Sequence, residues 1–135
     1  MQKWRSELAG LIIKSPYIEQ ILAGDKTWEI RGKPTSKRGR IALVKSGARS
    51  IVGVCEITDV IGPLTLQMLQ LSLDRHRDEK DAQSLPYETT YAWVLNNVVS
   101  FEQPIPFANP SGAVTWVRLS DEIILNIEES LRSQR

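Results

Sequence analysis

The feature that most constrains the fold of this chain is a series of short β-rich runs, separated by turns that contain glycine or proline. The runs cover residues 8–14, 26–31, 40–45, 50–61, 89–101 and 113–119. Strands of this length with few helices are typical of an α+β fold built around a curved or barrel-like sheet. A parallel nucleotide-binding sheet would need regularly alternating helices and a glycine-rich phosphate loop, and the sequence has neither.

Three further segments have helical patterns. They cover residues 16–24, 64–82 and 120–132. The first follows Ser15 and has Pro16 at its start, which is typical of a helix N-terminus, and Gly24 is a natural stop. Ser120 is a candidate N-cap of the last helix. The sequence therefore predicts a small sheet with short flanking helices.

Length and composition limit the other possibilities. A chain of 135 residues is expected to form one domain, residues 1–135, with a core from about 8 to 119. No apolar run reaches the ~18 residues of a membrane span, and residues 1–7 lack the apolar core of a signal peptide. One Cys and one His cannot form a zinc site that needs four such ligands. We therefore expect a cytoplasmic protein without membrane attachment, metal or cofactor.

A catalytic Cys–His pair would have to be Cys55 with His76, because the sequence has no other residue of either type. Cys55 lies in the apolar run 51–57, which predicts a buried and unreactive thiol. His76 lies in the charged run 74–81, which predicts an exposed helix residue.

The charges are unevenly distributed along the chain. Residues 26–49 contain eight basic side chains and a single acid, Glu29, for a net charge of +7. The other residues contain nine basic and fifteen acidic side chains, for a net charge of −6. Such a distribution gives a nearly neutral protein a positive face for a polyanion, although a basic loop can also serve only solubility.

Residues 26–31 carry the most informative chemistry. Because side chains alternate along a strand, Glu29 and Arg31 project from one face with Thr27, and Trp28 projects from the other. An acid, a base and a hydroxyl on one face can bind a small polar ligand, with Lys26 reaching in from the strand's start. An ordinary surface ion pair between Glu29 and Arg31 would show the same pattern.

The segment from Gly24 to Arg31 matches the pattern G-x-K-x-x-E-x-R and resembles the signature of ASCH domains, which belong to the PUA-like superfamily. Further ASCH-like features are Ser15-Pro16-Tyr17, Ile51-Val52-Gly53, Trp93-Val94-Leu95 and Pro104-Ile105-Pro106. The resemblance covers residues 10–119. It implies a small PUA-like β-barrel of mixed, mostly antiparallel strands with two to four short flanking helices.

The resemblance also implies binding of RNA, more readily single-stranded than double-stranded, or of a modified nucleoside. The ligand cleft would be floored by Lys26, Glu29 and Arg31, and a basic loop would follow the phosphates. The residues expected in that loop are Lys33, Lys37, Arg38 and Arg40. Tyr17, Trp28 and Trp93 are candidates for stacking on a base, and Ser15 is a further candidate contact.

Some ASCH proteins are enzymes, so a metal-independent hydrolase is the alternative. In the type that hydrolyses N4-acetylcytidine, a Lys at the position of Lys26, a Thr at the position of Glu29 and a later Glu are catalytic. Glu29 departs from that pattern, and Thr27 is the hydroxyl that this sequence offers instead. A neutral Lys26 would act as a base, whereas a Lys26 held charged by Glu29 would bind an anion.

Two other functions stay open on the sequence. A ribonuclease would use Lys26 to stabilise the phosphorane, and Ser111 or Tyr91 would handle protons. A module that docks an acidic protein would use the basic loop alone.

Overall fold

The computed structural model of the chain describes residues 8–134. The strands are β1 (Ala9–Ile13), β2 (Trp28–Arg31), β3 (Gly39–Lys45), β4 (Ser50–Ile61), β5 (Tyr91–Pro106) and β6 (Trp116–Arg118). The helices are α2 (Tyr17–Leu22), α3 (Leu66–Leu71), α4 (Leu73–His76) and α5 (Asp121–Ser133). This mixture confirms the α+β class that the sequence predicts.

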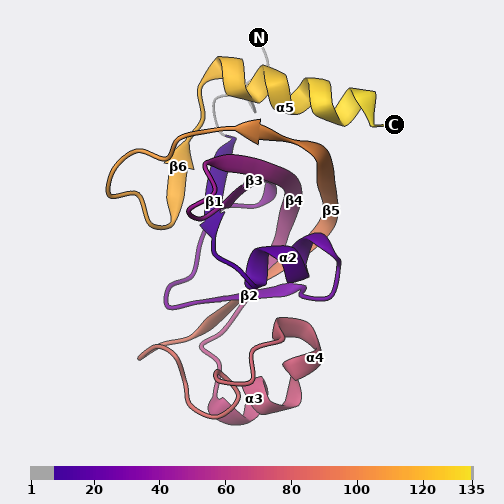
Figure 1. Ribbon diagram of the computed structural model, residues 1–135. Helices are drawn as coiled ribbons and strands as arrows, with labels where there is room; N and C mark the ends of the chain where they lie inside the picture. Colours follow the sequence, from indigo (N-terminus) through magenta and orange to yellow (C-terminus); the bar gives the residue numbers. More distant parts are fainter. Residues whose placement is uncertain (1–7, 135) are drawn as a thin grey trace.

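The strands form one curled sheet in the order β2-β5-β4-β3-β1-β6 (Figure 1). β1 and β3 run parallel, and the other neighbouring strands are antiparallel. Two cis peptide bonds precede Pro16 and Pro63, at the start of α2 and just after β4. With this strand order, the curled sheet is a half-barrel whose edges are β2 and β6.

Both faces of the sheet are buried, which explains why the runs in β1 and β3 are continuously apolar. Leu11 and Ile13 project to the face that α2 covers with Ile18. Ile12 projects to the opposite face, against the apolar side of α5. In Figure 1, α5 lies across one end of the sheet, and α3 and α4 lie beyond the other end.

Side chains connect the two ends of the curled sheet, where β2 and β5 approach β1 and β6. Trp93 of β5 stacks on Trp116 of β6, with ring centroids 5.7 Å apart and an interplanar angle of 14°. Arg31 at the end of β2 donates a hydrogen bond from Nη2 to the carbonyl of Ile12 in β1, at 3.0 Å. We call this region between the two edges the seam.

The structure corrects several expectations. The predicted helix 64–82 is two short helices, because the chain leaves helical geometry first at Ser72, where φ is −120°, and again at Arg77, where φ is 61°. His76 is not exposed but fully buried, since its ring turns inward and bonds the carbonyl of Leu69. β5 extends past the predicted run 89–101 to Pro106, and β6 is shorter than the predicted run 113–119.

Two other expectations, which concern Ser120 and Cys55, are confirmed. Ser120 caps α5 by accepting a hydrogen bond from the backbone N–H of Ile123, at 3.2 Å. Cys55 is buried, and burial raises the pKa of its thiol to about 12, so it is an unreactive core residue. Among the described residues, none of the helices is long and apolar enough to cross a membrane.

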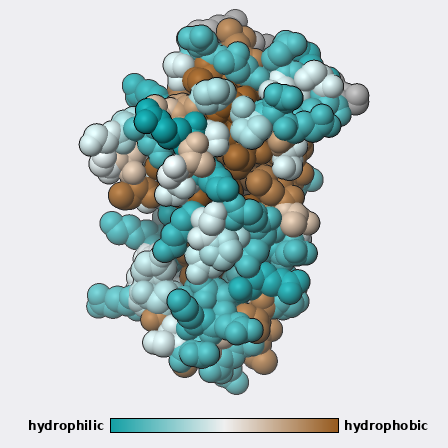
Figure 2. All heavy atoms as spheres, viewed as in Figure 1, coloured by the Kyte–Doolittle hydropathy of each residue, from teal (hydrophilic) through white to brown (hydrophobic). Residues whose placement is uncertain are grey.

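The surface is not uniform in polarity. On the face drawn in Figure 2, hydrophilic side chains cover most of the half that holds α3 and α4. Hydrophobic side chains show between α5 and the sheet on the same face.

Gly53 is predicted to be essential for the contact between β4 and β5. A Cβ atom at this position would lie 2.3 Å from the carbonyl oxygen of Val99. Gly53→Ala should therefore lower the free energy of unfolding by about 3 kcal/mol or more, because a backbone strand has to move. Urea denaturation measures this loss, with Ser100→Ala on the partner strand as the control. Equal stability of the two variants would contradict the close approach.

Candidate functional site

A polar cleft of about 380 Å³ lies along the seam, between β1, β2, α2 and the segment after α4. Its polar side chains come from distant parts of the chain. They include Tyr17, Lys26, Glu29, Arg31, Asp78 and Asp81. The structure thus brings the three predicted signature residues and Tyr17 together in one cleft.

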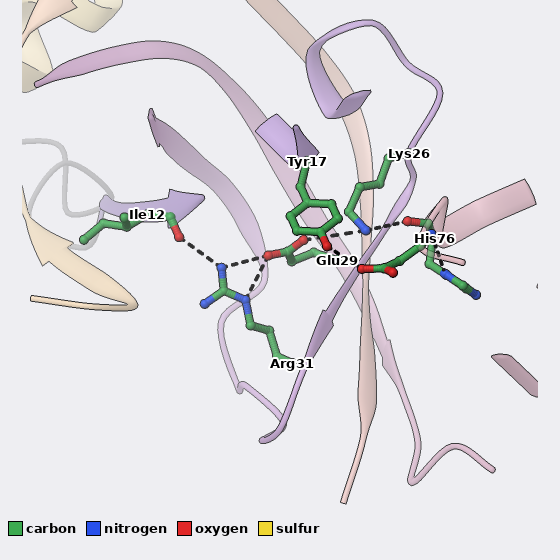
Figure 3. Close-up of polar contacts among 7 residues, drawn as sticks. Ile12, Tyr17, Lys26, Glu29, Arg31 and His76 are labelled. Carbon is green, nitrogen blue, oxygen red and sulfur yellow. Dashed lines mark hydrogen bonds and ion pairs between the residues drawn. The ribbon is translucent and has the colours of Figure 1, made fainter. Parts of the chain in front are cut away.

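Glu29 lies at the centre of this cleft, between two cations (Figure 3). Its Oε2 atom accepts hydrogen bonds from Nε of Arg31 at 2.9 Å and pairs with Nη2 at 2.8 Å. Its Oε1 atom is 3.8 Å from Nζ of Lys26. Glu29 is only 6% exposed, so its charge depends on these partners.

Lys26 is the most deeply buried charged residue of the cleft, at 2% exposed. The turn at Gly24, with φ at 84°, ends α2 and directs Lys26 inward. Its Nζ donates a hydrogen bond to the carbonyl of His76 at 2.7 Å and lies 5.1 Å from the centroid of the Tyr17 ring. Burial lowers the pKa of Lys26, while Glu29 raises it and limits that shift.

The opposite wall is built by the segment after α4. Tyr17 donates a hydrogen bond from its hydroxyl to Asp78, and this raises the pKa of Tyr17 above its usual range. Burial alone would raise the pKa of Asp78, but hydrogen bonds from Tyr17 and from two backbone N–H groups lower it. Asp81 is different, because burial and the charge of Asp78 raise its pKa. The wall thus holds two carboxyl groups of unequal acidity.

His76 fixes this wall without entering the cleft. Its Nδ1 accepts a hydrogen bond from the backbone N–H of Asp78 at 3.0 Å, so Nε2 carries the proton and donates it to the carbonyl of Leu69 at 2.7 Å. This arrangement requires a neutral imidazole. The buried ring therefore positions both Asp78 and the carbonyl that Lys26 bonds.

A second cleft of about 690 Å³ adjoins the first. It includes the predicted residues Lys33 and Trp93 together with Trp116 and Tyr87. Nζ of Lys37 lies 5.1 Å from the ring centroid of Trp116. The basic loop thus forms one side of this second cleft, which extends the first along the seam.

The other predicted loop residues, Arg38 and Arg40, are exposed. Nη1 of Arg38 donates hydrogen bonds to the carbonyls of Thr35 and Lys37, both at 2.8 Å, and so helps to hold the loop's shape.

Outside the basic loop, three further predicted residues do not line either cleft. Trp28 packs on the other side of β2, in a cluster with Leu64 and Leu69, and Arg75 lies 5.5 Å from its ring centroid. Thr27 uses its backbone, which bonds α4 and β5. Ser15 is exposed, and its hydroxyl donates to Glu19 at 2.9 Å.

The sequence did not single out Asp78, Asp81, Tyr87 or Trp116, which the structure places in the clefts. Asp78 and Asp81 belong to a charged run typical of a solvated helix face, and no local pattern separates them from it. Over residues 8–134, no group of three or more His, Cys, Asp or Glu side chains is arranged to hold a metal ion.

The fold and the site together define a small α+β half-barrel with a buried Lys-Glu-Arg cluster at its seam. The sequence matches the ASCH domain family over residues 11–105. This is most of the chain, and the protein therefore belongs to the ASCH domain family, as the signature segment predicted.

Solved structures with the same fold support this assignment. A crystal structure of ASCH from Zymomonas mobilis is 19% identical, covers 90% of this chain and 94% of its own, and has a TM-score of 0.66. A Ser-to-Ala mutant of the same protein is 17% identical over 93% and 98%, with a TM-score of 0.71. A Tyr-to-Phe mutant is 18% identical over 90% and 96%, with a TM-score of 0.69. At this identity the likeness concerns the fold. The search of curated proteins found no match.

Lys26 is predicted to titrate below the ordinary lysine pKa of 10.5, because burial disfavours its charged form. The ¹³Cε chemical shift of Lys26, assigned by comparison with Lys26→Met, measures this, with exposed Lys33 as the internal control. Between the lowered pKa and 10.5 the unfolded chain binds more protons than the folded one. The free energy of unfolding, relative to Lys26→Met, should therefore rise with pH in that window. A Lys26 that titrates at the ordinary value of 10.5 would contradict the geometry.

Proposed function

We propose that this ASCH domain binds single-stranded RNA, with a base in the cleft of Lys26, Glu29 and Arg31 and the phosphates along the basic loop. The observation that carries this proposal is the position of Arg31, which lines both clefts. On one side it belongs to a recessed polar site, and on the other to a cleft that Lys33 of the basic loop also lines. Such a pairing suits a ligand that has a polar ring and a charged backbone.

The first cleft has the donors and acceptors that a nucleobase needs. Lys26 and Arg31 can donate to carbonyl and ring-nitrogen acceptors, and Glu29, Asp78 and Asp81 can accept from exocyclic amino groups. Its volume of about 380 Å³ is in the range of small-molecule sites. Single-stranded RNA presents its base edges unpaired, so a base can enter such a cleft.

The basic loop supplies affinity that does not depend on sequence. The window 26–49 carries a net charge of +7, and Lys33, Arg38 and Arg40 are exposed within it. Lysine and arginine contacts to phosphates release condensed counterions, so binding weakens steeply as salt rises.

Binding of a fluorescein-labelled RNA decamer of mixed sequence should therefore fall with salt. Lys33→Ala and Lys37→Ala should each weaken it and lower the slope of log K against log salt by about 0.7, the contribution of one phosphate contact to a single strand. Fluorescence anisotropy at several salt concentrations measures both effects.

Arg132→Ala is the matched control, because Arg132 is exposed on α5 and pairs there with Glu129. This variant should bind as the wild type does. Binding that is absent at low salt, or that responds to the control as strongly as to the loop variants, would overturn the proposal.

A metal-independent hydrolase is a second candidate, and the burial of Lys26 is the observation that favours it. Burial lowers the pKa of the amine, so a neutral Nζ can take a proton from water. In N4-acetylcytidine that water would add to the acyl carbon, and the proton would pass to N4 as the C–N bond breaks. The products would be cytidine and acetate. In a ribonuclease, the charged amine would instead stabilise the phosphorane.

This second candidate predicts release of cytidine from N4-acetylcytidine in EDTA, which liquid chromatography with mass detection would follow. Lys26→Met should abolish the release, since the variant keeps the bulk of the side chain and loses the amine. Lys80→Met at an exposed position should retain it. Unchanged N4-acetylcytidine at high enzyme concentration would reject amide hydrolysis and leave RNA binding in place.

A further inference from the structure

Tyr87 has no role in the function derived so far, yet it lies between the two clefts. Tyr87 and Arg31 are the two residues that line both of them. Tyr87 is also 44% exposed, so its ring is accessible to a ligand. An exposed aromatic ring at the junction of two polar clefts is the kind of surface on which a nucleobase stacks.

The local structure holds this ring in place. A Cβ atom at Gly32 would lie 2.9 Å from Cδ1 of Tyr87, so the ring packs directly against the backbone of β2's continuation. The hydroxyl of Thr89 donates to the carbonyl of Gly32 at 3.3 Å, and that of Thr90 donates to the carbonyl of Tyr87 at 3.3 Å. These contacts restrict the Tyr87 side chain, so little conformational entropy is lost when a ligand binds to it.

The second cleft has an aromatic wall beside Tyr87. Trp93 and Trp116 stack on each other, and cations lie against their rings, Arg31 at 5.7 Å from Trp93 and Lys37 at 5.1 Å from Trp116. Lys37 has a flexible stem, so it can leave Trp116 to contact a phosphate while a base takes its place. The second cleft can thus bind a nucleobase of the ligand against Trp116.

Arg31 is placed to contact the group that would connect ligands in the two clefts. Its guanidinium has five N–H donors. Nε and Nη2 bond Glu29 and the carbonyl of Ile12 (Figure 3). Within the described part of the chain no hydrogen bond involves Nη1, which is left to meet an anion between the clefts.

We propose that the two clefts bind two successive nucleotides of one RNA strand. One base enters the cleft of Lys26 and Glu29, the next lies against Trp116, and Tyr87 stands between them while Arg31 contacts the linking phosphate. This inference rests on the proposed RNA binding and names its minimal ligand, an unstacked dinucleotide step. Tyr87 contacts the ligand directly in this scheme. Its stacking on a base does not depend on whether the amine of Lys26 is charged.

The test is competition against the labelled RNA decamer by the four nucleoside 5′-monophosphates and the four matching dinucleoside monophosphates. At least one dinucleotide should compete about tenfold better than its mononucleotide. Tyr87→Ala should remove at least about fivefold of that advantage, because base–aromatic stacking is lost. Tyr87→Phe, which keeps the ring, should retain it. Leu85→Ala is the matched control, since Leu85 is similarly exposed at 40% in the same loop.

The outcomes separate this inference from the function on which it rests. If the decamer binds with the expected salt dependence but dinucleotides compete no better than mononucleotides, the two-nucleotide site is overturned and RNA binding stands. The same conclusion follows if Tyr87→Ala and Leu85→Ala behave alike. If the decamer does not bind at low salt, both proposals fail together.

Discussion

The ion pair between Glu29 and Arg31 is the interaction on which the seam depends. A carboxylate that is 6% exposed must be paired, and Arg31 supplies two contacts to it at 2.8 and 2.9 Å. The same guanidinium bonds the carbonyl of Ile12, so it links β2 to β1 at a place where the sheet order provides no strand pairing. This one ion pair therefore both helps to link β2 to β1 across the seam and forms the centre of the polar cleft.

Lys26 connects the same cleft to His76, which lies 50 residues later in the sequence. Its hydrogen bond to the carbonyl of His76 fixes α4 against the start of β2. The neutral ring of His76 then holds the backbone of Asp78, and Asp78 holds Tyr17. Because each step is buried or partly buried, a ligand meets a cleft whose walls are already arranged, which reduces the ordering that binding has to supply.

The sequence predicted those parts of the site that depend on local strand alternation and on the signature residues. Alternation in residues 26–31 placed Glu29 and Arg31 on one face, and the structure has them together in the cleft. The far wall could not be predicted, because it depends on a left-handed residue at Arg77 that ends α4 and turns Asp78 inward. Trp116 and Tyr87 come from loops or short strands whose partners are distant in sequence, so their positions follow from tertiary contacts alone.

The two functions considered for this cleft need opposite protonation states of Lys26. Its hydrogen bond to the carbonyl of His76 needs only one N–H, so both the neutral and the charged amine can form it. The protonation state of Lys26 therefore depends on the charges around Nζ. Glu29 forms an ion pair with it, at 3.8 Å. Arg31 already shares that carboxylate, which weakens its support for a charged Lys26. The phosphate of a bound RNA strand beside Arg31 would add negative charge near the cleft and favour the charged amine, whereas a neutral acylated base would not. Under the two proposed functions, the ligand itself would thus select whether this amine binds an anion or acts as a base.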